Sequence, residues 1–518
     1  MNGALSLLRT LRASGVDTVF ANPGTSEMHF VAALDDAPDV RGVLCLFEGV
    51  ATGAADGFAR VSGRPAATLL HLGPGLGNGF ANLHNARRAR TPVVNVVGDH
   101  ATYHVALDPP LASDIAAVAG ALEGWVGRAD TPDEVAERTR EALAAAYGPP
   151  GRVATLVLPA DASWGDLTRE PDLTPVVAGR PRPVDPVRVE EAGRALRQGR
   201  TALLLGGDAT RGPSLVAAER IARATGARVI VETFPAVMDR GRGVPQPERL
   251  IYLVEFAQSQ IQDLDHLILV GAEDPVGFFA YPGVPGRVTA PTTTVVTLAS
   301  PGDDARGALD ALVESVGAPK VSIADPGPAV TPTGALTTET FAAAIAATLP
   351  EGAVVVDESN TSGLHLYGRT VASAPHQLLT LTGGAIGFGA PAAVGAALAH
   401  RGRVVAIVAD GSLLYTVQSL WTMAREGLDV TVVALSNRAY AILELERSRV
   451  GVGGPVGDAS RHLLQLTDPD LDLATIARGL GVPAVRAQSA DELVGALRRS
   501  YATPGPTFIE AMLPPGLS

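Results

Sequence analysis

The stretch VVAIVADGSLLYTVQSLWTMAREGLDVTVVALSN, residues 404–437, combines two short apolar runs with a helical pattern between them. The runs 404–408 and 430–435 indicate buried strands, and the spacing from Asp410 to Asn437 suits one βαβ crossover. Such a crossover brings both strand ends to the same sheet edge, and a helix beginning at Ser412 would offer free N–H groups to a phosphate there. Mg²⁺ prefers oxygen ligands of this kind together with phosphate and water, so the stretch predicts a magnesium–phosphate site. The alternative is an ordinary turn after a strand at Asp410 and Gly411.

The same alternation of apolar runs and helical patterns extends over the whole chain. Two Pro-rich segments without periodicity, 165–186 and 317–332, divide it into three blocks. Runs that indicate strands occur in each block, at 18–21, 43–47, 66–70 and 93–97, at 202–205, 228–231 and 266–270, and at 353–356, 404–408 and 430–435. The pattern is typical of doubly wound parallel sheets. We therefore predict an α/β protein with three such domains, at 1–165, 187–316 and 335–518.

The composition of the 518 residues narrows the class of protein. With 46% hydrophobic and 18% charged residues, the chain suits a large globular enzyme better than a disordered protein. Its formal net charge of −13 would not attract nucleic acid or an anionic membrane. No apolar run is long enough for a membrane span, and Arg9 and Arg12 interrupt the apolar segment at the N-terminus. We expect a cytoplasmic protein with no nucleic-acid or membrane partner.

Two residue types are nearly absent, and this excludes several chemistries. Cys45 is the single cysteine, which excludes intrachain disulfides, thiolate zinc sites and iron–sulfur clusters. Lys320 is the single lysine and lies in a Pro-rich segment, so Schiff-base catalysis and a Walker-type phosphate loop are excluded. The chain also has no Gly-x-Ser-x-Gly motif of the kind that carries a hydrolase nucleophile.

A second candidate site residue is Glu48, which follows the run 43–47 and begins the helical pattern EGVATGAADGFAR at 48–60. A glutamate at a helix N-terminus is often only a cap that compensates the helix dipole. Its apolar neighbours Phe47 and Val50 would exclude water from the carboxyl group, which favours a chemical role.

These two segments resemble motifs of thiamine diphosphate (ThDP) enzymes. Residues 409–440 are similar to the family's diphosphate–magnesium motif, with Ala409 and Ser436 in place of a glycine and an asparagine. The metal ligands implied by the resemblance are the side chains of Asp410 and Asn437 and the carbonyl of Ala439. The cofactor contacts implied in the same motif are Gly411, Ser412 and Tyr440.

The pattern around Glu48 resembles the one that holds the family's cofactor-activating glutamate. That glutamate shares a proton with N1′ of the aminopyrimidine, so the resemblance implies the same role for Glu48. Further implied cofactor contacts are Asn22, Pro23, Gly24 and Thr25 near the pyrimidine, the carbonyl of Gly384 for the 4′-amino group, Ile386 beneath the bent cofactor, and Asn360 and Thr361 at the diphosphate.

His71 follows the run 66–70 and precedes a Gly-rich turn. One interpretation is that it only hydrogen-bonds the turn backbone. By resemblance it matches an active-site histidine of benzoylformate decarboxylase, which implies proton transfer. The second histidine of that enzyme has no match, because the region 271–283 offers Phe278 and Phe279 instead. His100 and His104 could replace it or could be surface loop residues.

The resemblance implies a ThDP- and Mg²⁺-dependent enzyme acting on a small-molecule 2-oxo acid. Loss of CO₂ would leave an enamine, which a decarboxylase protonates and a carboligase joins to a second carbonyl. The similarity in 22–27, 47–60 and 71–78 is greatest to acetolactate synthase large subunits, but Asp99 stands where those enzymes have a glutamine. Benzoylformate decarboxylase-like activity without ligation is the alternative.

Two other classes stay open at this stage. A pyruvate oxidase-like enzyme would bind FAD, which we do not expect because Gly206-Gly207-Asp208 and Gly271-Ala272-Glu273 lack the G-x-G-x-x-G fingerprint. A non-catalytic paralogue that acts as a binding or regulatory protein is disfavoured by the intact Glu48 together with Asp410 and Asn437. The resemblance also implies a homodimer or homotetramer, because each family site forms between the first domain of one subunit and the third domain of another.

Overall fold

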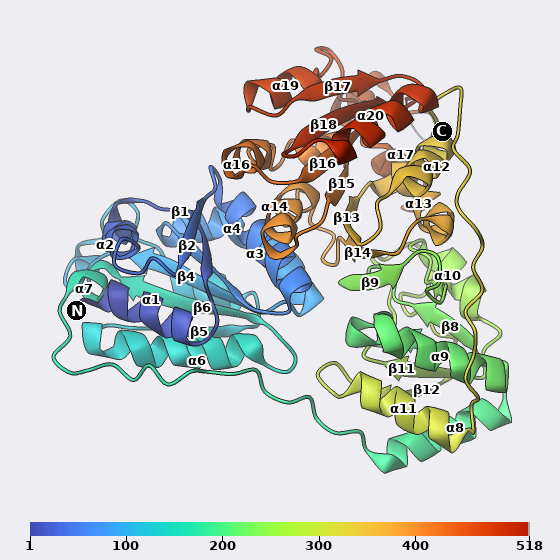
Figure 1. Ribbon diagram of the computed structural model, residues 1–518, viewed down its shortest axis with the longest axis horizontal. Helices are drawn as coiled ribbons and strands as arrows, with labels where there is room; N and C mark the ends of the chain where they lie inside the picture. The colour runs from blue at the N-terminus through green and yellow to red at the C-terminus, as the bar shows by residue number, and fades with distance from the viewer. Residues whose placement is uncertain (516–518) are drawn as a thin grey trace.

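Three β-sheets with flanking helices make up the protein in the computed structural model, which describes residues 1–515 (Figure 1). The N-terminal sheet has the order β2-β1-β3-β4-β6-β5, the middle sheet β10-β8-β7-β11-β12, and the C-terminal sheet β17-β18-β16-β15-β13-β14-β9. All neighbouring strands are parallel except β9, which is antiparallel to β14. The prediction of an α/β protein with three parallel-dominated sheets is therefore confirmed. We call each sheet with its helices a unit.

The elements have the following bounds. The N-terminal unit contains α1 (Gly3–Ala13), β1 (Thr18–Asn22), α2 (Met28–Ala33), β2 (Arg41–Leu44), α3 (Glu48–Ser62), β3 (Ala66–Leu70), α4 (Leu72–Ala89), β4 (Val93–Asp99), α5 (Ile115–Gly120), β5 (Trp125–Arg128), α6 (Val135–Tyr147), β6 (Val153–Pro159) and α7 (Ala160–Trp164). The middle unit contains α8 (Pro186–Gln198), β7 (Thr201–Leu205), α9 (Gly212–Thr225), β8 (Arg228–Val231), β10 (Glu248–Arg249), α10 (Val254–Ile261), β11 (His266–Val270), β12 (Thr294–Ala299) and α11 (Ala305–Ser315). The C-terminal unit contains β9 (Val237–Arg240), α12 (Thr338–Thr348), β13 (Ala353–Glu358), α13 (Leu366–Arg369), β14 (His376–Thr380), α14 (Gly389–Ala399), β15 (Val404–Ala409), α15 (Asp410–Leu413), α16 (Ser419–Glu426), β16 (Val430–Ser436), α17 (Ala441–Arg449), α18 (Asp458–Leu464), α19 (Leu473–Gly479), β17 (Ala484–Ala487), α20 (Ala490–Ala502) and β18 (Thr507–Met512). Among these described helices, none combines the length and apolar character that a membrane crossing requires.

Each sheet has a point at which its winding direction reverses. The reversal lies between β1 and β3 in the N-terminal sheet, between β7 and β11 in the middle sheet, and between β13 and β15 in the C-terminal sheet. At such a point the two loops leaving the strand ends diverge and open a crevice, where doubly wound sheets bind ligands. At the N-terminal reversal, Asn22 ends β1 and His71 follows β3, and at the C-terminal reversal Asn360 and Asp410 follow β13 and β15. Glu48 and Asn437 follow β2 and β16, each one strand farther from the reversal.

Helix α3 of the N-terminal unit packs closely on α14 of the C-terminal unit. A Cβ on Gly57 would lie 2.0 Å from the carbonyl oxygen of Ala392, and one on Gly395 would lie 1.8 Å from that of Ala54. Glycine is required at both crossings because any side chain would collide with backbone. Buried apolar residues of the two units consequently form one continuous core.

Three local features differ from the sequence prediction. The run 43–47 is a strand only up to Leu44, because the chain turns there and leaves Leu46 exposed on its way into α3. A short helix begins at Asp410 instead of Ser412, and its first carboxylate lies where it offsets the helix dipole. Strand β9 lies in the middle block of the sequence, yet it pairs with β14 of the C-terminal sheet.

Candidate cofactor and active site

Two loops that leave β15 and β16 meet at Asp410. Its buried carboxylate accepts the N–H of Gly411 at 2.8 Å and the N–H of Arg438 at 2.7 Å. Burial raises the pKa of Asp410, and this effect outweighs the backbone hydrogen bonds, which lower the pKa. Within residues 1–515 no cationic side chain pairs with it. A buried carboxylate without a counter-ion, beside the amide of the buried Asn437, fits a bound metal ion.

The loops around Asp410 have little freedom. A Cβ on Gly411 would lie 2.5 Å from the ring of Tyr440, so this position has no room for a side chain. Asn360 donates from Nδ2 to Ser412 Oγ at 2.9 Å and thereby joins the loops after β13 and β15 across the reversal point. Asn360 and Arg438 both adopt left-handed backbone, with φ of 51° and 59°. Such strained positions persist only when the surroundings hold them, which is typical of binding loops.

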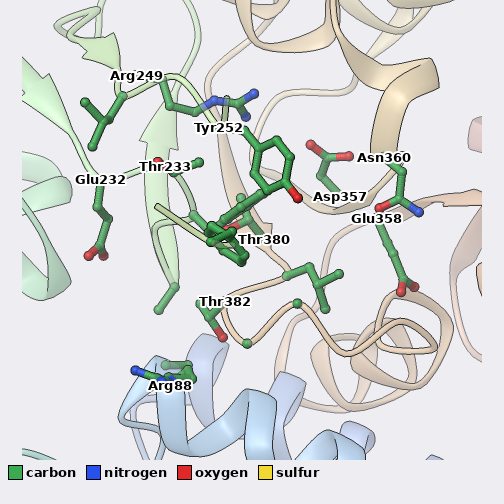
Figure 2. A pocket seen from close by; sticks show the side chains of 18 of the residues that line it. Arg88, Glu232, Thr233, Arg249, Tyr252, Asp357, Glu358, Asn360, Thr380 and Thr382 are labelled. Atoms are coloured by element: carbon green, nitrogen blue, oxygen red, sulfur yellow. The ribbon is translucent and has the colours of Figure 1, made fainter. Parts of the chain in front are cut away.

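These loops line a cavity of about 1750 Å³ that reaches the strand ends of the middle sheet. Figure 2 shows Asp357, Glu358 and Asn360 on one wall of this cavity and Arg249 and Tyr252 on another. The predicted site residues that line it are Asn360, Thr361, Gly384, Ile386, Asp410, Gly411, Ser412, Asn437, Ala439 and Tyr440. The structure thus brings together the whole predicted set from the third block.

Residues 382–387 form the part of the wall where the aminopyrimidine contacts were predicted. Gly384 has a φ of 73°, a conformation that favours glycine, and a Cβ there would lie 3.3 Å from the ring of Phe278. Phe278 packs edge-on against Phe234 with ring centroids 5.3 Å apart and lies 5.1 Å from Tyr252. The loop therefore faces an aromatic cluster supplied by the middle unit.

Glu358 is a site residue that the sequence prediction did not assign. Its carboxylate accepts the N–H groups of Gly387 and Gly389, both at 2.6 Å, and that of Phe388 at 3.2 Å. Complete burial raises its pKa to about 7 in spite of these hydrogen bonds. Glu358 holds the start of α14 and the end of the 382–387 loop against β13. Its position at a strand end was the one signal in the sequence.

The N-terminal unit gathers a second group of predicted residues. His71 Nδ1 lies 2.8 Å from Glu27 Oε2, which also accepts the N–H of Gly24 at 2.8 Å. The His71 ring leaves no room for a side chain on Gly24, and Leu72, which follows it, has a strained φ of 51°. Burial raises the pKa of Glu27, and the hydrogen bonds from Gly24 and His71 oppose that shift. Glu27 was missed in the sequence, although it stands in the same loop as Asn22 to Thr25.

Glu48 is the first residue of α3 and is 6% exposed. Its Oε2 accepts a hydrogen bond from Asn78 Nδ2 at 3.0 Å, and a Cβ on Gly75 would lie 3.2 Å from its Oε1. Helix α4 therefore approaches this carboxylate closely and holds it in one orientation. Asn22 and Pro23 lie at the end of β1, and Thr25 begins a short 3-10 helix over Thr25–Glu27.

The two groups of residues are separate within one chain. Glu48 and His71 do not line the cavity that contains Asp410. His100 and His104 lie next to each other, with ring centroids 5.8 Å apart, and they too are outside it. The predicted site residues of one chain therefore form two separate groups on two different units.

Comparison with known families finds two matches that fit this division. Residues 1–122 match the N-terminal TPP binding domain of thiamine pyrophosphate enzymes, and residues 362–511 match their C-terminal TPP binding domain. The first region contains Glu48 and His71, and the second contains Asp410 and Asn437.

Individual relatives cover nearly the whole chain. The protein of Mycobacterium tuberculosis named "Putative acetolactate synthase large subunit IlvX" is 52% identical over 99% of both chains. Benzoylformate decarboxylase of Pseudomonas aeruginosa is 31% identical over 96% of both chains. The structure of the ThDP-dependent 4-hydroxybenzoylformate decarboxylase of Rhodococcus jostii has a TM-score of 0.85 at 23% identity and covers 100% of both chains, which is a likeness of fold.

Proposed function

Because the chain belongs to the family of thiamine pyrophosphate enzymes, we propose that it is a ThDP- and Mg²⁺-dependent enzyme that decarboxylates a 2-oxo acid. The observation that carries this proposal is the buried carboxylate of Asp410, which has no counter-ion among the described residues and lies beside Asn437 in the large cavity. Bound ThDP would supply a carbon nucleophile that adds to the 2-oxo group and holds the electron pair that stays behind when CO₂ leaves.

The residues of the C-terminal unit would hold the cofactor. Asp410, Asn437 and the carbonyl of Ala439 would bind the metal, while Asn360, Thr361 and Ser412 would contact the diphosphate. The tight loop at Gly411 would let the diphosphate approach the backbone, with Tyr440 covering it. The carbonyl of Gly384 would accept a hydrogen bond from the 4′-amino group, and Ile386 would keep the two rings at an angle. No cluster of three or more His, Cys, Asp or Glu side chains competes as a metal site in the described chain.

The N-terminal unit would supply the proton chemistry to a second copy of the chain. Glu48 would exchange a proton with N1′ of the aminopyrimidine, held in place by Asn78. His71 would hold its Nδ1–H toward the Glu27 carboxylate, which leaves Nε2 free to accept and release a proton. Since both residues lie outside their own chain's cavity, the proposal requires a homodimer in which each cavity receives the partner's N-terminal half-site. Exposed apolar side chains at the cavity, such as Phe279 and Leu463, suit such a contact.

The fate of the carbon that loses CO₂ distinguishes two candidate reactions. The His71–Glu27 pair favours protonation of that carbon, which gives an aldehyde and makes the enzyme a decarboxylase. Ligation to a second carbonyl is the other candidate, favoured by the 52% identity to a protein named for acetolactate synthesis. Asp99 disfavours acetolactate itself, because its carboxylate is engaged by Arg128 at 2.5 Å and lines a separate small cavity.

A product assay tests both candidates. The protein loaded with ThDP and Mg²⁺ is incubated with aromatic, branched and short 2-oxo acids, each with and without an acceptor aldehyde, and the products are identified by mass. Aldehyde formation supports the decarboxylase, and a hydroxyketone that appears only with acceptor supports the ligase. Neither product from any 2-oxo acid, in a preparation that binds ThDP, would overturn the proposal. The Asp410→Ala variant serves as the blank for uncatalysed reactions.

A further inference from the structure

Two buried asparagines on α4, Asn82 and Asn85, connect the N-terminal unit to the 382–387 loop. They are 2% and 0% exposed and contact no strand of their own sheet through their amides. Burial of two amide groups costs free energy unless each donor and acceptor has a partner. Their partners are therefore informative about what this part of the molecule must hold in place.

Asn82 bridges two segments that the proposed function uses. Its Nδ2 donates to the carbonyl of Gly49 at 2.8 Å and to that of Gly387 at 3.0 Å. Gly49 follows Glu48 in the first turn of α3, and Gly387 ends the 382–387 loop. A Cβ on Gly53 would lie 2.9 Å from the same Nδ2, so α3 packs directly on this amide.

Asn85 fixes the middle of the loop by bonding to both backbone groups of one residue, Ala385. Its Nδ2 donates to the carbonyl of Ala385 at 2.8 Å, and its Oδ1 accepts the N–H of the same residue at 3.2 Å. The remaining amide hydrogen goes to Asn82 Oδ1 at 3.0 Å, which joins the two side chains. The backbone carbonyl of Asn85 accepts the hydroxyl of Thr382 at 2.8 Å, and Figure 2 shows Thr382 next to the helix that carries Arg88.

Ala385 lies between Gly384 and Ile386, the two loop residues assigned to the aminopyrimidine. We propose that Asn82 and Asn85 are positioning residues: they set the place of the Gly384 carbonyl and of the Ile386 side chain, and Asn82 sets the first turn of the Glu48 helix as well. This inference rests on the proposed function, since it concerns the same cofactor site. It adds that the pyrimidine end of each cavity is aligned by the N-terminal unit of the same chain.

Asn95 provides a matched control. It is also a fully buried asparagine of the N-terminal unit, and it bonds only to Thr68 and Thr155 on the neighbouring strands. Asn95→Ala therefore removes a buried amide and its two side-chain hydrogen bonds without touching the loop. Its melting temperature should fall, whereas its ThDP affinity should stay within about twofold of wild type, because a stability change elsewhere does not move the loop.

The test compares Asn85→Ala, Asn82→Ala and Asn95→Ala by calorimetric titration with ThDP and Mg²⁺ and by hydrogen–deuterium exchange at C2 of the bound cofactor. Asn85→Ala should weaken ThDP binding at least about tenfold, because it leaves both backbone groups of Ala385 without partners. Asn82→Ala should weaken it about threefold, since Gly387 keeps the hydroxyl of Thr416 as a donor, and should also slow C2 exchange.

Asn82→Ala keeps the test decisive if Asn85→Ala does not fold, because Gly387 then still has its second donor. The inference is overturned if the folded variants bind ThDP and exchange C2 at the rates of Asn95→Ala. Failure of the wild-type protein to bind ThDP would instead overturn the proposed function, so the two failures are distinguishable.

Discussion

The cavity has two ends that are built in different ways: the proposed diphosphate end around Asp410 and Asn360, and the proposed pyrimidine end at the 382–387 loop. At the diphosphate end, Asp410 bonds to the backbone of Arg438, 28 positions away, and Asn360 bonds to Ser412, 52 positions away. All these residues lie in segments that follow strands of one sheet. At the pyrimidine end, the 382–387 loop is held by Asn82 and Asn85, which lie about 300 positions earlier in the chain. Arg60 adds a hydrogen bond to the carbonyl of Thr380 at 2.7 Å from the same unit.

This difference predicts how each end of the cavity responds when one unit shifts against the other. The diphosphate end depends on one βαβ crossover and on short loops, so it should keep its geometry whenever the C-terminal sheet folds. The pyrimidine end depends on how closely α3 and α14 pack, and a shift of one unit against the other would move the loop. Glu358 connects the two ends. It is the last residue of β13, and its carboxylate accepts hydrogen bonds from the backbone N–H groups of residues 387–389.

The largest expected effect is a loss of ThDP affinity on mutation of the proposed diphosphate end. Asp410→Ala should weaken ThDP binding in the presence of Mg²⁺ by at least about 1,000-fold, because a buried charged ligand and its bonds to two backbone N–H groups are lost. Calorimetric titration measures this. Asp274→Ala, which removes a cavity acid of the middle unit, should bind normally. Unchanged affinity in Asp410→Ala would remove the metal assignment.

His71→Ala should lower turnover by about 100-fold, near the lower end of the range for a general acid–base group, and should leave ThDP binding nearly unchanged. ThDP binding should persist because His71 is not among the residues that line the cavity, where the proposed metal and diphosphate contacts lie. Glu27→Gln, which keeps the size of the side chain and removes its charge, should have a smaller effect. Steady-state kinetics with the best 2-oxo acid provides the measurement, with His29→Ala as the control. Wild-type turnover in His71→Ala would mean that the histidine only supports the turn.

Glu48→Gln should slow hydrogen–deuterium exchange at C2 of bound ThDP by at least about tenfold, because the amide cannot share an ionisable proton. The packing of α3 and the hydrogen bond with Asn78 should survive, so the cofactor should still bind. Glu339→Gln is a suitable control, since Glu339 also lies in the first turn of a helix but does not line the cavity. Exchange at the wild-type rate would reduce Glu48 to a helix cap.

The smallest expected effect concerns Glu358 and the connection between the two ends. Its pKa of about 7 in the folded protein lies above 4.5, so the folded state binds more protons than the unfolded state between about pH 4.5 and 7. The contribution of Glu358 to stability is therefore present at low pH and lost as the pH rises through 7. Replacement by Gln removes this titration.

Melting temperatures measured from pH 5 to pH 8 provide the check. The wild-type protein should lose several degrees more over this range than Glu358→Gln, because a pKa raised from 4.5 to about 7 corresponds to roughly 2–3 kcal/mol. Asp357→Asn, on the same strand end, should keep most of the wild-type slope, because burial raises the pKa of Glu358 more than the Asp357 charge does. Parallel pH profiles for the wild-type protein and Glu358→Gln would show that Glu358 stays ionised throughout.

Much of the diphosphate end could be predicted from the sequence. The apolar runs 404–408 and 430–435 and the spacing between Asp410 and Asn437 indicated one crossover, and the structure places both residues beside the same cavity. The predicted start of the helix at Ser412 was two residues late, since a carboxylate can itself occupy the first helical position. The roles assigned to these residues stay predictions until the cofactor is measured.

Sequence reasoning missed Glu27, Glu358, Asn82 and Asn85. Each of them has at least one hydrogen-bond partner that lies between 29 and 305 positions away, and no periodicity of the sequence reveals such a partner. A lone Asn on a helix therefore looks like any other polar residue. The separation of Glu48 and His71 from the cavity of their own chain was also absent from the patterns, and entered only through the resemblance to a family.

The sequence by itself determined the three parallel-dominated sheets, the strand ends that carry polar residues, and the local loop around Asp410. Those features follow from hydrophobic periodicity and from crossover length, which act over a few tens of residues. Only the tertiary structure decided which strand ends share a cavity and which side chains align the 382–387 loop. The reason is that these contacts exist only after α3 and α14 pack at glycine crossings such as Gly57 and Gly395, which bring residues 300 positions apart into hydrogen-bond distance.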